Sequence, residues 1–148
     1  MAHRFTLIPA VHLFLIKNDQ ILLLRRFNTG YEDGNYSVPA GHLDGNEAAT
    51  KAMVREAQEE TGITLQPEAL QLAHVMHRRK PAEERIDFFF TARNWRGDPH
   101  IMEPHKCDDL SWFPLNQLPH NTVPYVRSAI NNYLHNQIYS GYGWQGEV

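Results

Sequence analysis

Runs of apolar and β-branched residues predict two strands near the start of the chain, over Thr6 to Ile16 and Ile21 to Arg26. The residues between them, Lys17-Asn18-Asp19-Gln20, contain an Asn-Asp pair that suits the tight turn of a β-hairpin. The segment Asn28 to Asn35 combines glycine, aspartate and asparagine without apolar periodicity, which indicates a surface loop. We expect this loop to shape the mouth of a pocket.

Two helices are predicted from composition and end signals. The first covers Glu47 to Thr61, where helix-forming residues occur without glycine or proline, and Gly62 follows where a left-handed residue would cap the helix. The second covers Pro124 to Ile138, with proline in its first turn. Its apolar stripe would consist of Val126, Ile130, Tyr133, Leu134 and Ile138.

Three more strands are predicted over Leu70 to His77, Ile86 to Trp95 and Leu110 to Phe113. The polar segment Arg78 to Arg85 would join the first two as a long loop. Strands on both sides of one helix, with a second helix near the end, favour an α/β fold with helices on the faces of a mixed sheet. The 148 residues suit a single domain over 1–148, with a core of about 5–138 and a flexible C-terminal tail from Ser140 to Val148 that packs at most through its aromatic residues.

Net charge, hydropathy and cysteine content limit the kinds of partner and the cellular compartment that we expect. The formal net charge of −3 gives no broad basic field, which argues against a long nucleic acid, whereas a small polyphosphate needs only a metal ion and a few basic residues. The apolar run Ala10 to Ile16 is too short to span a membrane, so no membrane partner is expected. The single cysteine, Cys107, precludes an intrachain disulfide and suits a reducing compartment, so we expect a cytoplasmic protein.

The acidic residues of the first predicted helix are spaced for metal binding. Glu56, Glu59 and Glu60 are three and four residues apart, so their carboxylates can converge on one helix edge. Their mutual repulsion calls for a cation, and hard oxygen donors suit Mg²⁺, with Mn²⁺ as a possible substitute. A solvated helix face is the ordinary explanation of a glutamate-rich helix. The fixed spacing of this helix to Gly41 and Glu47 disfavours that explanation.

Residues flanking these glutamates are further candidates. Ala40 and Gly41 offer a bare backbone that phosphate or metal can approach, and the Ala40 carbonyl is a candidate metal ligand. Arg55 points about 100° away from Glu56 on the helix, so it suits orienting a carboxylate or contacting phosphate. The candidates for binding substrate are three basic residues that could contact phosphate and one aromatic residue that could stack on a base, although solvated charges and core packing explain such residues more often: Arg25, Arg78, Arg79 and Tyr36.

The segment Gly41 to Ile63 resembles the Nudix box, Gly-x5-Glu-x7-Arg-Glu-U-x-Glu-Glu-x-Gly-U with U an aliphatic residue, and matches it at every fixed position. The resemblance implies the Nudix fold, an α/β/α sandwich around a central mixed sheet in which the box forms a loop-helix-loop. It also implies that Glu56, Glu59 and Glu60 coordinate Mg²⁺, that Arg55 orients Glu56, and that Glu47 braces the box.

In this family a carboxylate outside the box often acts as general base, and Glu103, Asp108 and Asp109 are the candidates, of which we prefer Asp108. The implied reaction is metal-assisted hydrolysis of a phosphoanhydride in a small nucleotide. The first hypothesis is a MutT-like enzyme that converts a nucleoside triphosphate to the monophosphate and pyrophosphate. The alternative is a hydrolase of nucleoside diphosphate derivatives such as ADP-ribose or dinucleoside polyphosphates. A nucleotide sensor without turnover is disfavoured because every box carboxylate is present.

Overall fold

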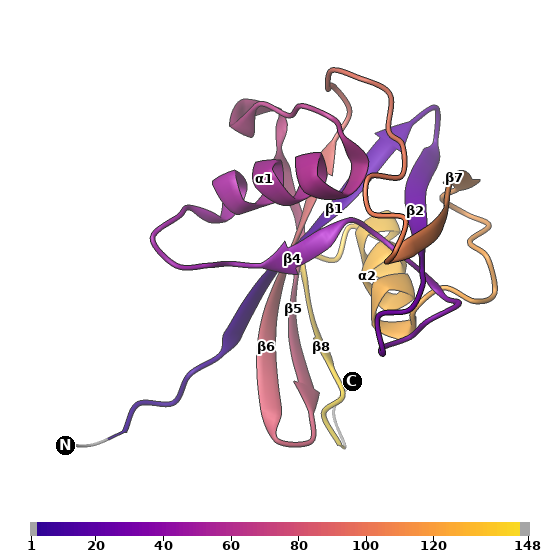
Figure 1. The fold of residues 1–148 in the computed structure, drawn as a ribbon. Coiled ribbons are helices and arrows are strands. Elements are labelled where there is room, and N and C mark those ends of the chain that lie inside the picture. Colours follow the sequence, from indigo (N-terminus) through magenta and orange to yellow (C-terminus); the bar gives the residue numbers. More distant parts are fainter. Residues whose placement is uncertain (1–2, 146–148) are drawn as a thin grey trace.

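A mixed sheet between two helices organises the computed structural model, which describes residues 3–145 (Figure 1). The helices are α1 (Ala49–Thr61) and α2 (Pro124–Leu134), with a short 3-10 helix η1 (Pro67–Ala69). The strands are β1 (Ile8–Lys17), β2 (Gln20–Arg26), β3 (Tyr36–Ser37), β4 (Ala40–His42), β5 (Gln71–Lys80), β6 (Glu83–Ala92), β7 (Cys107–Pro114) and β8 (Tyr139–Tyr142).

The strand order is β3-β2-β1-β6-β5-β8, with β4 paired to β1 and β7 paired to β2. The β1–β6 and β5–β8 pairs are parallel and the other strand pairs are antiparallel. Within residues 3–145, no helix has the length and apolar character needed to cross a membrane.

Strand β1 is buried on both faces, because side chains alternate between the two sides of a strand. Its residues Val11, Leu13 and Leu15 join the core beneath α1, which also contains Met53 and Ala57. Its other face joins the core beneath α2, which contains Phe14, Ile16, Val126, Ala129 and Ile130. The two cores on opposite faces confirm the predicted α/β sandwich with a mixed sheet.

Two local predictions are confirmed at turns. Asn18 and Asp19 both have positive φ, 51° and 60°, and join β1 to β2 as a two-residue hairpin. Gly62 caps α1 in the left-handed conformation with φ 78°, and its N–H donates to the carbonyl of Gln58. The start of α1 differs from the prediction, because the helix begins at Ala49 and Glu47 lies in the preceding loop.

The predicted long loop from Arg78 to Arg85 is wrong. Strands β5 and β6 continue through it until Lys80 pairs with Glu83, and only Pro81 and Ala82 form the turn. Figure 1 shows this hairpin extending beyond the rest of the sheet. The segment is strongly charged, yet Arg78 is a buried strand residue because it pairs with a buried carboxylate on the neighbouring strand.

The C-terminal segment also corrects the prediction. Helix α2 ends at Leu134, so Ile138 lies outside the helix and is exposed, whereas Val126 and Ile130 are buried as expected. Part of the expected flexible tail forms β8 beside β5. The Trp144 ring N–H donates to the carbonyl of His77 at 2.8 Å, and residues 146–148 lie outside the described part.

His74 forms hydrogen bonds with this C-terminal segment, and its burial leads us to expect that stability depends on pH. Its Nδ1 donates to the carbonyl of Gln137 and its Nε2 accepts from the Ser140 hydroxyl, both at 2.7 Å. Burial lowers the pKa of His74, and burial likewise lowers that of His12, from the ordinary value of 6.5. At these two histidines the unfolded chain therefore binds more protons than the native chain as pH falls through that value, so their contribution to stability falls with pH.

We expect the free energy of unfolding from urea titrations to be lower at about pH 5.5 than at about pH 7.5. Replacing His74 with Gln should reduce this difference, because one group that must remain neutral in the native state is removed. A His74→Gln protein with the full wild-type difference would contradict the assignment.

Candidate active site

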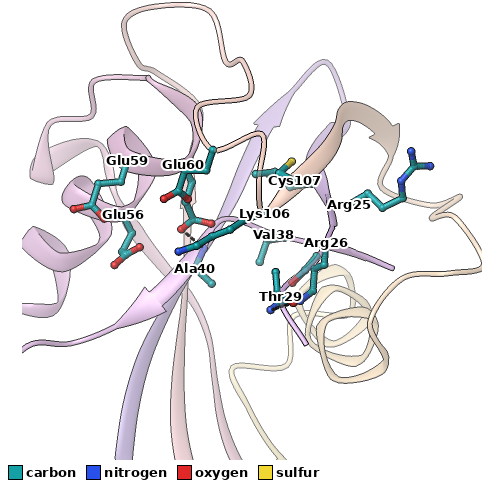
Figure 2. A pocket seen from close by; sticks show the side chains of 13 residues that line it. Arg25, Arg26, Thr29, Val38, Ala40, Glu56, Glu59, Glu60, Lys106 and Cys107 are labelled. Atoms are coloured by element: carbon teal, nitrogen blue, oxygen red, sulfur yellow. Dashed lines mark hydrogen bonds between the residues drawn. The ribbon is translucent and has the colours of Figure 1, made fainter. Parts of the chain in front are cut away.

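A cavity of about 330 Å³ lies between α1, β2 and the segment that leads into β7. Figure 2 shows acidic side chains of α1 on one side, Arg25 and Arg26 on the other, and the Lys106 side chain reaching between them. Its polar lining residues include Arg25, Arg26, Thr29, Glu56, Glu60 and Glu103. The predicted helix carboxylates therefore face a cavity of a size suited to part of a nucleotide.

Glu60 lies deepest among the box glutamates. The backbone N–H of Ala40 donates to its Oε2 at 3.1 Å, which ties the helix to the loop that precedes it. Burial, and then the neighbouring Glu56, raise the pKa of Glu60 well above its ordinary value. A carboxylate that is removed from water and placed against a second one needs hydrogen-bond donors or a nearby positive charge to be stable as an anion.

Glu56 occupies space that only a glycine leaves free. A Cβ built on Gly41 would overlap the carboxyl group of Glu56, so the absence of a side chain at this position admits the glutamate. Arg55 Nη1 donates to Glu56 Oε1 at 2.8 Å. The carboxylate is thus held between the backbone of β4 and a guanidinium group.

Arg55 joins the helix to the loop before it. Its Nη2 donates to Glu47 Oε1 at 2.8 Å and lies 3.3 Å from Asp44 Oδ2. The hydrogen bonds to Glu47 and Glu56 outweigh the opposing effect of burial and raise the pKa of Arg55. The hydrogen bond from Arg55 lowers the pKa of Glu47. This is the geometry that an orienting role for Arg55 and a bracing role for Glu47 require.

Glu59 departs from the predicted convergence. It lines the cavity but its side chain is 52% exposed, and its Oε2 lies 3.7 Å from Arg55 Nη1. In the part of the chain that the structure describes, no three acidic, histidine or cysteine side chains already stand as a set of metal ligands. The structure brings Glu56 and Glu60 together and leaves Glu59 at the rim.

The donor set nevertheless suits a hard divalent cation. Glu56 and Glu60 supply carboxylate oxygens at the same point, where burial and then the charge of Glu56 raise the pKa of Glu60. The carbonyl of Ala40 belongs to a residue that already contacts Glu60 through its N–H. Glu56, Glu60 and the Ala40 carbonyl are therefore the groups that could hold a divalent cation, with Glu59 as a further candidate at the rim.

A methyl group at position 41 tests this arrangement. Gly41→Ala should push the Glu56 carboxylate out of place and reduce kcat by roughly a hundred-fold, because a small misplacement of a catalytic group is costly. Steady-state assays with circular dichroism as a folding control measure this effect. Gly45→Ala is the matched control, because no atom lies near the position of its Cβ. Its φ of 86° strains an alanine, so this variant controls for the loss of stability that a glycine substitution causes.

The candidate residues outside the box differ in whether they line the cavity. Arg25 lines the cavity, and its Nε donates to Asp108 Oδ1 at 2.7 Å, whereas Asp108 itself is not among the residues that line it. Glu103 does line the cavity, and its charge acts on Glu60. The geometry thus favours Glu103 over Asp108, which sequence reasoning had preferred.

The remaining substrate candidates are not brought to this cavity. Tyr36 is buried at the edge of the Phe113 ring, so neither face is free for a base. Arg78 is buried, and Arg79 lies over the ring of Trp144. Sequence reasoning missed Thr29 and Lys106, which line the cavity from loops where no motif or periodicity marks individual residues.

The thiol of Cys107 also lines this cavity. It donates to the carbonyl of Asp109 at 3.2 Å, and burial raises the pKa of the thiol. A thiol that stays protonated is a poor nucleophile, which agrees with a reaction that needs no covalent intermediate.

Comparisons with known proteins identify the family. Residues 6–133 match the NUDIX domain, so the chain belongs to the Nudix family, as its box predicts. It is 30% identical over 113 residues to a NAD-capped RNA hydrolase NudC of Pseudomonas entomophila, covering 75% of this chain and 38% of that protein. It is 28% identical to the 8-oxo-dGTP diphosphatase of Escherichia coli, covering 72% of this chain and 81% of that protein.

Among solved structures, a MutT NUDIX hydrolase from Burkholderia pseudomallei has a TM-score of 0.78 at 27% identity, covering 86% of this chain and 98% of that one. These named relatives confirm the prediction of a MutT-like Nudix hydrolase. The chain spans well under half the length of the NudC relatives, so their activity and substrates are not carried over to it.

Proposed function

We propose that this protein catalyses Mg²⁺-dependent hydrolysis of a phosphoanhydride bond in a small nucleotide. The observation that carries the proposal is the half-buried pair Glu56 and Glu60, fixed by Arg55 and by the Ala40 N–H beside a cavity with basic residues. Neither carboxylate contributes to the hydrophobic core. Repulsion between the two neighbouring carboxylates destabilises the fold, and a bound cation would offset this repulsion.

When bound, Mg²⁺ would polarise the phosphate and make a water molecule more acidic. Arg55 keeps the Glu56 carboxylate pointing at the cavity, and the Ala40 N–H does the same for Glu60. Arg26 and Lys106 face them and suit the phosphate oxygens. We assign the general base to Glu103, whose carboxylate lies on the lining and can accept a proton from water.

Two substrate classes follow from the sequence, and each has a named relative. The 8-oxo-dGTP diphosphatase of E. coli acts on a nucleoside triphosphate, as in the first hypothesis. The NudC relatives are hydrolases of NAD-capped RNA. For this chain we propose a small nucleotide as substrate, because a net charge of −3 provides no broad positive field to bind a long RNA. We propose the cytoplasm as the compartment, because the single cysteine suits a reducing environment.

A nucleotide panel tests the proposal. Purified protein is incubated with nucleoside triphosphates and nucleoside diphosphate derivatives, with and without Mg²⁺, and the products are identified by chromatography. We expect turnover of at least one class, lost on chelation of the metal. Binding of a nucleotide without turnover of any would favour a sensor instead.

A further inference from the structure

A second cavity, of about 220 Å³, adjoins the candidate active site and shares Arg26 and Ala40 with it. We call it the basic cavity, because four basic side chains line it: Arg26 of β2, Arg78 and Lys80 of β5, and Arg85 of β6. Tyr31 and Tyr125 add aromatic faces. Among the described residues that line it, none is aspartate or glutamate.

The charges of the basic cavity are only partly neutralised. Arg78 pairs with Asp87 at 2.9 Å, and Glu83 lies 3.0 Å from Lys80 Nζ and 3.2 Å from Arg85 Nη2. Arg26 donates to neutral oxygens of Tyr31 and Thr29. Four cations thus face two carboxylates, both placed outside the lining, so the cavity favours an anion.

Two buried polar atoms at this cavity have no hydrogen-bond partner among the described residues: Arg85 Nε and His12 Nδ1. His12 is 2% exposed, and its Nε2 lies 3.0 Å from Asp87 Oδ1. Burial works against ionisation of Asp87, but hydrogen bonds from His12 and Arg78 lower its pKa to about 2, and burial lowers the pKa of His12. Nε2 of a neutral His12 is then the donor, which leaves Nδ1 to accept.

We propose that the basic cavity binds a ribose phosphate of the substrate, one that is not part of the anhydride cleaved in the adjoining site beside Glu56 and Glu60. Lys80 and Arg85 suit the oxygens of this phosphate, Arg26 lies between the two cavities, and His12 suits a ribose hydroxyl. This inference rests on the proposed function for the position of the cleaved bond. It favours a nucleoside diphosphate derivative with an additional phosphate over a nucleoside triphosphate.

Binding is tested first, with ribose 5-phosphate as the probe and no metal present. We expect it to shift the Arg85 Nε–H resonance in NMR spectra, whereas ribose alone should not. Arg85→Gln and Lys80→Gln should each weaken binding by roughly ten-fold, the value of one charge-assisted hydrogen bond. Arg93→Gln is the matched control, because Arg93 is exposed just after β6 and outside the cavity, and it should bind as wild type. Undetectable binding, or equal binding by all variants, would overturn the inference.

Turnover is tested next with matched pairs, NADP against NAD and coenzyme A against dephospho-coenzyme A. We expect kcat/KM to favour a phosphorylated member by roughly ten-fold, and Lys80→Gln to reduce this preference. No preference, or turnover confined to other nucleotides, would overturn the substrate class. Loss of all turnover with ribose 5-phosphate still bound would instead contradict the proposed function and leave the cavity assignment intact.

Discussion

Replacing Glu60 with Gln is expected to reduce kcat by roughly three orders of magnitude or more while the fold remains intact. The substitution keeps an oxygen that can accept the Ala40 N–H, so the link between α1 and β4 survives. It removes the negative charge that we assign to the cation, and it relieves the repulsion between positions 56 and 60. The unfolding temperature without metal should therefore not fall. Glu56→Gln should reduce kcat to a similar extent, although it also weakens the ion pair with Arg55.

Steady-state assays of purified variants measure this effect, with thermal unfolding recorded with and without Mg²⁺. Wild type should be stabilised by the metal and Glu60→Gln much less so, because ligand binding to the native state raises the unfolding temperature. Glu68→Gln is the matched control, since Glu68 lies exposed in η1 away from the cavity. A well-folded Glu60→Gln enzyme with near wild-type kcat would show that the carboxylate pair is not the reaction site.

Asp87→Asn is expected to cause the largest loss of stability, about 3–5 kcal/mol, because it leaves the charge of Arg78 buried without a counterion. Asp87 is fully buried on β6, where Arg78 Nε donates to it at 2.9 Å and His12 Nε2 at 3.0 Å. Since small proteins are stable by only about 5–15 kcal/mol, this is a large share of the total. The unfolding temperature should fall by roughly 10 °C.

Urea titration at several pH values measures the effect. The lowered pKa of Asp87, about 2 against an ordinary 3.8, stabilises the native state above the ordinary value, and this stabilisation is lost as pH falls from 3.8 towards 2. Wild type and Asp87→Asn should therefore differ most near neutral pH and converge in acid. Glu84→Gln is the matched control on the same strand, because Glu84 pairs only with a partly exposed His77. Equal stability of Asp87→Asn and wild type would refute the buried pair.

The local signals in the sequence predicted the centre of this site well. Glycine at 62 ends α1 as expected, and the three-and-four spacing places Glu56 and Glu60 on one side of that helix. Such features depend on a few neighbouring residues and on helix geometry alone. The two hydrophobic faces of β1 likewise follow from a nearly continuous apolar run.

Features that depend on distant partners were not predictable. Arg78 looks like a loop residue until the register of β5 and β6 places it beside Asp87. Gly41 is expected from the sequence to leave room for phosphate or metal, whereas in the structure the carboxyl group of Glu56 lies against it. Lys106 reaches the cavity because the segment before β7 lies beside the end of β2, where the Phe27 N–H donates to the Lys106 carbonyl, and no local pattern records this. Long-range packing outweighs local preference at each of these positions.

The central claim is best tested by incubating the wild-type protein with the nucleotide panel in isotopically labelled water, with and without Mg²⁺. The predicted result is metal-dependent cleavage of a phosphoanhydride, with one labelled oxygen incorporated into a phosphoryl product, because water is the nucleophile. Cleavage that persists at full rate without a divalent metal, or nucleotide binding without cleavage of any panel member, would contradict it.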